Sequence, residues 1–167
     1  VLWGHINMSE LKSGTSNTVS LCRNVAMATL NKAESIKDKF EITGWEITQT
    51  ANQGSIAPKD YTDENTNEPD GDKLNKTIGD CDKSNPAELY LFETPATVDS
   101  RIVIKANGKY YTGNFLDGTD GTGSKLPLLR NHHYKMTVTA TGEGYDTKAE
   151  ALKAPAGNIK VEIKDYN

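Results

Sequence analysis

Two adjacent histidines, His132 and His133, are the residues of this sequence whose types most suggest chemistry. Imidazole side chains bind metals and transfer protons near neutral pH, and the chain has only one other histidine, His5. The pair lies in the run LLRNHHYKMTV, whose alternation of apolar and polar residues predicts a β-strand. Neighbouring side chains of a strand point to opposite faces, so the two rings cannot chelate one ion. We expect one ring to pack at the edge of the fold and the other to face solvent.

Two further stretches resemble ligand-binding loops without completing the required pattern. Residues 117–125 (DGTDGTGSK) have the glycine spacing of a phosphate-binding loop, but Ser124-Lys125 stands where Lys-Ser or Lys-Thr is needed. Residues 63–72 (DENTNEPDGD) begin like an EF-hand calcium loop, but Glu68 and Leu74 occupy the places of its Gly and Glu. Both stretches are predicted to be solvated loops. Since no nucleophile and base arrangement is present either, the sequence predicts no catalytic, cofactor-binding or metal-binding residues and no enzyme activity.

The composition sets limits on the class of protein. Hydrophobic residues make up 35% of the 167 residues, mean hydropathy is -0.63 and the net charge is -4. The acidic balance and the lack of a basic stripe argue against nucleic-acid binding. No apolar run is long enough to span a membrane, and no signal peptide is visible before Val1, which indicates a mature or trimmed product. The sequence leaves open whether its two cysteines, Cys22 and Cys81, form a disulfide.

Short alternating runs separated by turn residues predict an all-β fold that would position these residues. Strands are predicted over residues 18–30, 40–48, 88–93, 101–106, 109–115, 134–140 and 159–164. The alternation changes phase at Gly44, which predicts a β-bulge, and Asn107-Gly108 predicts a type I′ hairpin turn. The best helix candidate is the short segment 147–153, with Asp146 as its expected N-cap.

A polar stretch divides the predicted strands into two groups. Residues 59–83 are too poor in apolar side chains to form a core element, so they are predicted to be a linker or a long surface loop. The expected domains are an N-terminal β-sandwich over residues 1–58, short enough to be incomplete, and a C-terminal β-sandwich over residues 84–167. An internal echo, in which Leu21 to Asn24 and Leu128 to Asn131 each precede a strand, supports two related sandwiches.

Alternation along the strands also predicts which side chains form the core. The predicted core residues are Leu21, Val25, Phe40, Ile42, Leu91, Ile102, Ile104, Tyr134, Met136, Val138, Val161 and Ile163.

Several motifs together resemble the fimbrillin family, the major-subunit-like pilus proteins of the Bacteroidales. The segments LWG (2–4), VSLCRNVA (19–26) and EITGW (41–45) are similar to its N-terminal half. The segments LFE (91–93), LRNHHY (129–134), GYDT (144–147), EAL (150–152) and IKVEIKDYN (159–167) are similar to its C-terminal half. Their order and approximate spacing agree along most of the chain.

The resemblance implies a structural protein of two transthyretin-like antiparallel β-sandwiches. Such subunits are exported as lipoprotein precursors, trimmed by a protease and joined by strand exchange into type V pili outside the outer membrane. The implied partners are other copies of the chain and related subunits in a head-to-tail filament, with surface ligands on host or bacterial cells. Neither the role as stalk, anchor or tip subunit nor the donor strand and acceptor groove follows from the sequence.

An alternative from another class is a cell-surface lipoprotein module that binds glycan. It would require exposed aromatic side chains on one groove, and Trp45, Tyr110 and Tyr111 are the candidates.

Overall fold

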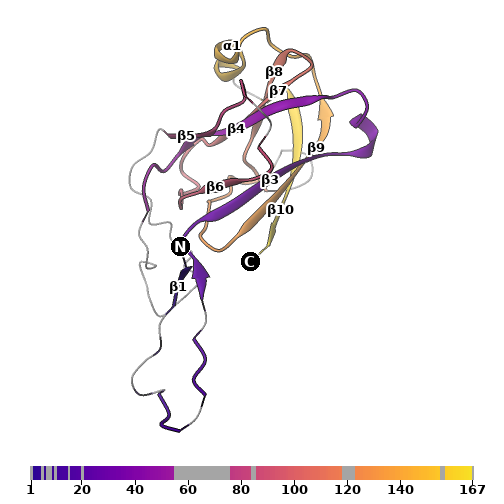
Figure 1. The fold of residues 1–167 in the computed structure, drawn as a ribbon. Coiled ribbons are helices and arrows are strands. Elements are labelled where there is room, and N and C mark those ends of the chain that lie inside the picture. Colours follow the sequence, from indigo (N-terminus) through magenta and orange to yellow (C-terminus); the bar gives the residue numbers. More distant parts are fainter. Residues whose placement is uncertain are drawn as a thin grey trace.

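Two four-stranded sheets face each other in the computed structural model, and a two-stranded ribbon extends away from them (Figure 1). The structure describes residues 2–4, 6, 9, 11–14, 16–19, 21–54, 76–83, 86–117, 123–154 and 157–166. The helical elements with described bounds are short: the helix α1 (Lys148–Lys153) and the 3-10 turn η2 (Glu34–Ile36). The prediction of an all-β sandwich is therefore confirmed. In the described residues, no helix is long and apolar enough to cross a membrane.

Each sheet takes its name here from a central strand. The β9 sheet has the order β10 (Ile159–Tyr166), β9 (His133–Thr141), β3 (Ala26–Lys32) and β6 (Leu89–Leu91). The β7 sheet has the order β5 (Lys76–Gly79), β4 (Ile42–Thr50), β7 (Arg101–Ala106) and β8 (Lys109–Asn114). Neighbouring strands are antiparallel except for β3 and β9, which are parallel. The ribbon pairs β1 (Leu2–Trp3) with β2 (Cys22–Arg23).

Strands from both sides of residues 59–83 contribute to both sheets. Strands β3 and β4 come from the first predicted domain, yet they pair with β9 and β7 from the second. The echoed motifs lie side by side, since the side-chain oxygen of Asn131 accepts a hydrogen bond from the Arg23 amide at 3.2 Å and the Asn131 amide donates to Val25 O at 3.1 Å. In the described residues, the repeated motif therefore precedes two adjacent parallel strands of one sandwich. The domain boundary expected at residues 59–83 does not separate the two sheets.

One hydrophobic core lies between the sheets. Nine of the predicted core residues are buried in it: Phe40, Leu91, Ile102, Ile104, Tyr134, Met136, Val138, Val161 and Ile163. Val25 and Ile42 are half-buried. The prediction for Leu21 is wrong, because this residue directly precedes β2, outside the two four-stranded sheets, and is 58% exposed.

Local sequence signals explain the turn and the bulge that shape the β7 sheet. Asn107 and Gly108 have φ values of 50° and 74°, which confirms the type I′ turn. The register shifts between Ile42 and Gly44, which confirms the bulge. A Cβ atom at Gly44 would lie 2.6 Å from the carbonyl oxygen of Cys81, so a side chain cannot be accommodated there without movement of the backbone.

The N-cap of the helix lies one residue later in the chain than expected. Thr147 is the N-cap of α1, and it forms a capping box with Glu150 in which each side chain accepts from the other residue's amide. Asp146, the predicted cap, instead pairs with Lys109 on β8.

Candidate functional site

The two histidines have separate partners. The Nδ1 atom of His132 lies 2.8 Å from a carboxylate oxygen of Asp165, and the Nε2 atom of His133 lies 2.9 Å from the hydroxyl of Thr29. Burial, together with the charge of Lys135, lowers the pKa of His133. Both rings are half-buried, so the expected contrast between a packed and a solvated ring is not seen. The pair fastens β9 to its neighbours β10 and β3, and in the described part no group of three potential ligands is placed to hold a metal.

The two stretches that resemble ligand-binding loops lie wholly or partly outside the described residues. None of residues 63–72 and none of residues 118–122 is described. The flanks of the glycine-rich segment are paired as a hairpin, since the Asp117 amide donates to Ser124 O at 2.8 Å and the Leu126 amide donates to Phe115 O at 3.2 Å. The segment therefore connects two paired flanks, as expected for a loop.

The outer face of the β7 sheet is covered by α1, which two charged residues of that sheet hold in place. Glu46 on β4 is buried, and one of its carboxylate oxygens lies 2.6 Å from Lys148 Nζ in the first turn of the helix. At the other end, Arg101 on β7 donates to the carbonyl oxygens of Leu152 at 3.2 Å and Ala154 at 2.7 Å. A cation beside the carbonyls of a helix C-terminus satisfies acceptors that would otherwise lack a partner.

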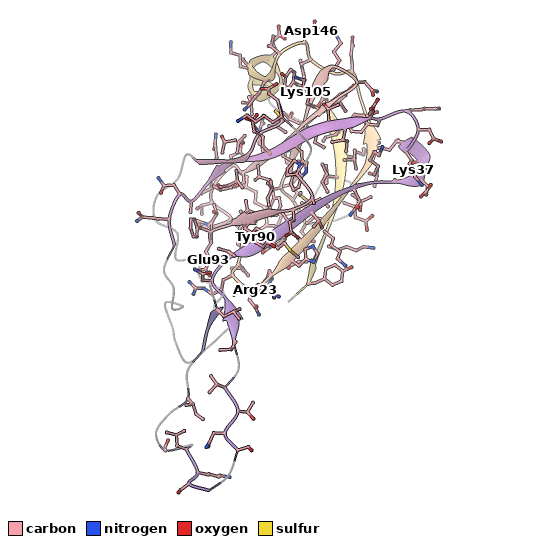
Figure 2. All side chains as sticks on the ribbon, viewed as in Figure 1. Arg23, Lys37, Tyr90, Glu93, Lys105 and Asp146 are labelled. Carbon is pink, nitrogen blue, oxygen red and sulfur yellow. The ribbon has the colours of Figure 1, made fainter. Side chains whose placement is uncertain are left out.

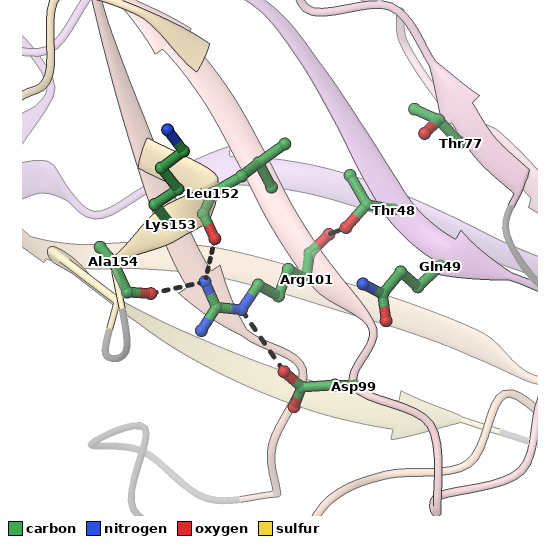
Figure 3. Close-up of a pocket in the computed structure, with 8 residues that line it drawn as sticks. All are labelled: Thr48, Gln49, Thr77, Asp99, Arg101, Leu152, Lys153 and Ala154. Carbon is green, nitrogen blue, oxygen red and sulfur yellow. Dashed lines mark hydrogen bonds and ion pairs between the residues drawn. The ribbon is translucent and has the colours of Figure 1, made fainter. Parts of the chain in front are cut away.

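A cavity of about 400 Å³ lies beside Arg101 (Figure 3). Asp99 lies at its rim, with one carboxylate oxygen 3.6 Å from Arg101 Nε and the other 2.9 Å from Lys125 Nζ. The hydrogen bond from Lys125 lowers the pKa of Asp99. The Arg101 guanidinium already donates to main-chain carbonyls at the end of α1. We therefore interpret this cavity as a consequence of that contact between β7 and the helix.

The three aromatic residues expected to line a glycan groove do not converge. Trp45 is fully buried, and its indole N–H donates to Pro86 O at 2.7 Å. Tyr111 packs edge-on against Phe40 in the core. Only Tyr110 lies on the outer face, where its hydroxyl donates to Asp82. The prediction of a groove lined by these three rings is wrong. Alternation along β8 directs Tyr111 into the core, and the bulge at Gly44 does the same for Trp45.

Cys81 has a free thiol, which is buried beside Glu46. Its amide donates to a Glu46 carboxylate oxygen at 3.4 Å. Burial, reinforced by the Glu46 charge, raises the pKa of the thiol from 9.0 to about 12. A group whose folded pKa is raised contributes stability that is fully present below its unfolded pKa. That contribution is lost as the pH rises from about 9 to about 12.

We expect Cys81 to resist alkylation in the folded protein, because the reactive thiolate is disfavoured and the sulfur is buried. In a Cys22→Ser variant, which leaves one thiol, iodoacetamide at pH 8 should modify Cys81 only at the rate at which the protein unfolds. In urea the modification should be fast. Mass spectrometry measures both rates, and equal rates with and without urea would contradict the buried placement.

A buried ion pair at one end of the core was not anticipated from the sequence. Arg130 and Glu93 have side chains that are each 1% exposed, and an Arg130 guanidinium nitrogen donates to a Glu93 carboxylate oxygen. Arg130 belongs to the Leu-x-Arg-Asn motif that occurs twice in the sequence. No local signal connects this arginine with a glutamate 37 residues away.

The sheet edges differ in how they are covered. On β8, the amide of Tyr110 donates to Tyr145 O at 2.8 Å and the amide of Thr112 donates to the Asn158 side chain at 2.8 Å. Strand β10 is the outermost strand of the β9 sheet, and among the described residues no strand pairs with its outer side. It is eight residues long, whereas the opposite edge strand β6 has three. The longest open edge of the described structure therefore belongs to β10.

Comparison with known proteins identifies the fold. No protein-family model and no curated protein sequence matches the chain. Among solved structures, a cell adhesion protein from Bacteroides uniformis aligns with a TM-score of 0.53 at 10% identity, over 89% of this chain and 52% of that one. The tip fimbrial protein from Porphyromonas gingivalis aligns with a TM-score of 0.48 at 12% identity, over 87% of this chain and 52% of that one. A fimbrilin from the same species aligns with a TM-score of 0.45 at 14% identity, over 93% of this chain and 63% of that one. This chain therefore spans about half the length of the first structures that it matches, and over that length it has the fold of the Bacteroides uniformis cell adhesion protein.

Proposed function

We propose that this chain is part of a structural pilus (fimbrial) subunit that polymerises by β-strand complementation and supports adhesion outside the cell. The observation that carries the proposal is the open edge of β10, where an eight-residue strand has no partner on its outer side in the described structure. An unpaired edge presents backbone donors and acceptors to which a strand of another chain can add. The shared fold with a bacterial protein described as a cell adhesion protein supports the same role.

The sequence of β10 suits an edge that pairs selectively. Its inward residues Ile159, Val161 and Ile163 anchor it to the core, while Lys160 and Lys164 point outward. Charged residues on an edge strand discourage pairing with arbitrary chains, so addition would require a complementary partner strand. The partners are other copies of the subunit and related subunits. Because a head-to-tail contact of this kind does not close on itself, repetition gives a filament. This role requires no enzyme activity and no cofactor.

Assembly and hydrogen exchange together test the proposal. Purified protein, incubated after protease trimming, should form filaments visible by negative-stain electron microscopy. In the filaments, those β10 amides that exchange freely in the monomer should become protected, because they donate to the added strand. Amides of β9, which is paired on both sides already, serve as the internal control and should change little. Persistent monomers, or filaments in which the β10 amides exchange as before, would refute strand addition at this edge.

A further inference from the structure

The outer face of the β9 sheet carries a row of side chains that crosses all of its strands. Tyr90 on β6 is the register partner of Met27 on β3, Met27 is the partner of His133 on β9, and His133 is the partner of Tyr166 on β10. Tyr90 is 52% exposed and Tyr166 is 46% exposed, while the two residues between them are half-buried. We call these four residues the cross-strand row.

In the described structure this face is open, in contrast to the β7 sheet. Helix α1 packs on β7 and β8, on the far side of the sandwich from the cross-strand row (Figure 1). Neighbouring strands are about 4.8 Å apart, so the row extends about 14 Å from β6 to β10. Exposed tyrosine rings at both ends of such a row form a long, shallow platform, not a deep pocket.

A cation accompanies each exposed tyrosine. Lys135 Nζ lies 4.7 Å from the centre of the Tyr166 ring. At the other end, Arg23 and Tyr90, which are both labelled in Figure 2, line the same cavity of about 500 Å³. In the part of the chain that the structure describes, neither cation forms an ion pair. Glu88, whose carboxylate accepts a hydrogen bond from the Tyr90 hydroxyl, is the acidic group at that end.

This combination favours one class of ligand. Aromatic faces carry negative charge, so they attract the polarised C–H groups on the flat faces of sugar rings. Cations that form no ion pair within the described structure lie beside those rings and complement carboxylates on the same ligand. We propose that the cross-strand row, with Lys135 and Arg23, binds a linear polysaccharide that carries uronate carboxylates. The inference rests on the extracellular location in the proposed function, but it does not depend on polymerisation.

Binding of short acidic and neutral oligosaccharides tests the inference directly. Isothermal titration of the monomeric protein with hyaluronan hexasaccharide should show saturable binding, and chitohexaose, which has no carboxylates, should bind much more weakly. Tyr90→Ala and Tyr166→Ala should each weaken hyaluronan binding about tenfold, the size of one lost aromatic contact. Lys135→Glu should weaken it further, and added salt should weaken binding by the wild-type protein.

Matched variants separate a local site from general effects. Lys160→Glu makes the same charge change as Lys135→Glu at the other end of the same face, and Tyr110→Ala removes a tyrosine from the other sheet. Both should bind hyaluronan like the wild type. Thermal unfolding of each variant verifies that the fold is intact.

Four results would overturn the inference: no saturable binding, equal binding of chitohexaose, an equal effect of Lys160→Glu, or equally effective competition by a poly-glutamate peptide. Negative-stain microscopy of Tyr90→Ala distinguishes this inference from the proposed function. Filaments formed by this variant, together with its weakened hyaluronan binding, support both. Hyaluronan binding that the row variants weaken, in a wild-type protein that never forms filaments, supports the row and refutes the pilus subunit.

Discussion

Arg130→Met should lower the free energy of unfolding by about 3–5 kcal/mol, a large share of the stability of a domain of this size. The substitution removes one member of an ion pair whose side chains are each 1% exposed, so the Glu93 carboxylate would remain buried without its cation. An isolated buried charge is costly because it has lost its hydration without gaining a compensating partner. The measurement is the free energy of unfolding in urea, with circular dichroism as the probe.

Two further variants identify the physical cause of that loss. The double variant Arg130→Met with Glu93→Leu should recover much of the lost stability, because it replaces the whole pair by apolar side chains. Lys37→Met breaks the Lys37–Glu34 pair, whose side chains are 59% and 87% exposed, and should cost less than about 1 kcal/mol. If Arg130→Met costs as little as Lys37→Met, the pair is not desolvated as the structure shows.

Elements specified by neighbouring residues could be predicted from the sequence. The predicted segment 101–106 coincides with β7, and the Asn107-Gly108 turn has the predicted positive φ values. In both cases the information is local, because alternation sets the faces of a strand and only a few residue types tolerate positive φ. The segment 18–30 shows the limit of such reasoning. It is apolar without a clear period, and the structure divides it between β2 and β3, with Leu21 exposed.

Relations between distant residues could not be predicted in this way. The parallel pairing of β3 with β9 joins Met27 to His133, and no local pattern in either strand encodes its neighbour. The same holds for the candidate surface: Tyr90 and Tyr166 belong to one platform only because β6 and β10 are the two edges of one sheet. The sequence-based prediction named Tyr111 and Trp45 instead. Both rings are buried in the core, which the sequence around them does not reveal. Strand order is a property of tertiary packing, so the site became visible only with the fold.

Val161→Lys should destabilise the protein by about 3 kcal/mol or more, whereas Lys160→Val should change stability by less than about 0.5 kcal/mol. The two adjacent positions of β10 point to opposite faces of the sheet, and the register against β9 shifts between them. Val161 is 3% exposed in the core, where a Cβ atom placed on Gly113 would lie 3.0 Å from its methyl group, while Lys160 is exposed. A lysine at position 161 would bury an ammonium group without a partner, or force β10 away from the sheet.

The pair of variants therefore reports the register of β10, the strand on which the proposed assembly depends. A slip of one residue would exchange the two faces of the strand, and with them the two effects on stability. Urea midpoints measured side by side distinguish the alternatives, with Lys160→Val as the matched control for a change at the same edge. A strongly destabilised Lys160→Val together with a tolerated Val161→Lys would show that β10 pairs with β9 one residue out of the register described here. In that case Tyr166 would also turn inward, and the cross-strand row would lose one of its two exposed rings.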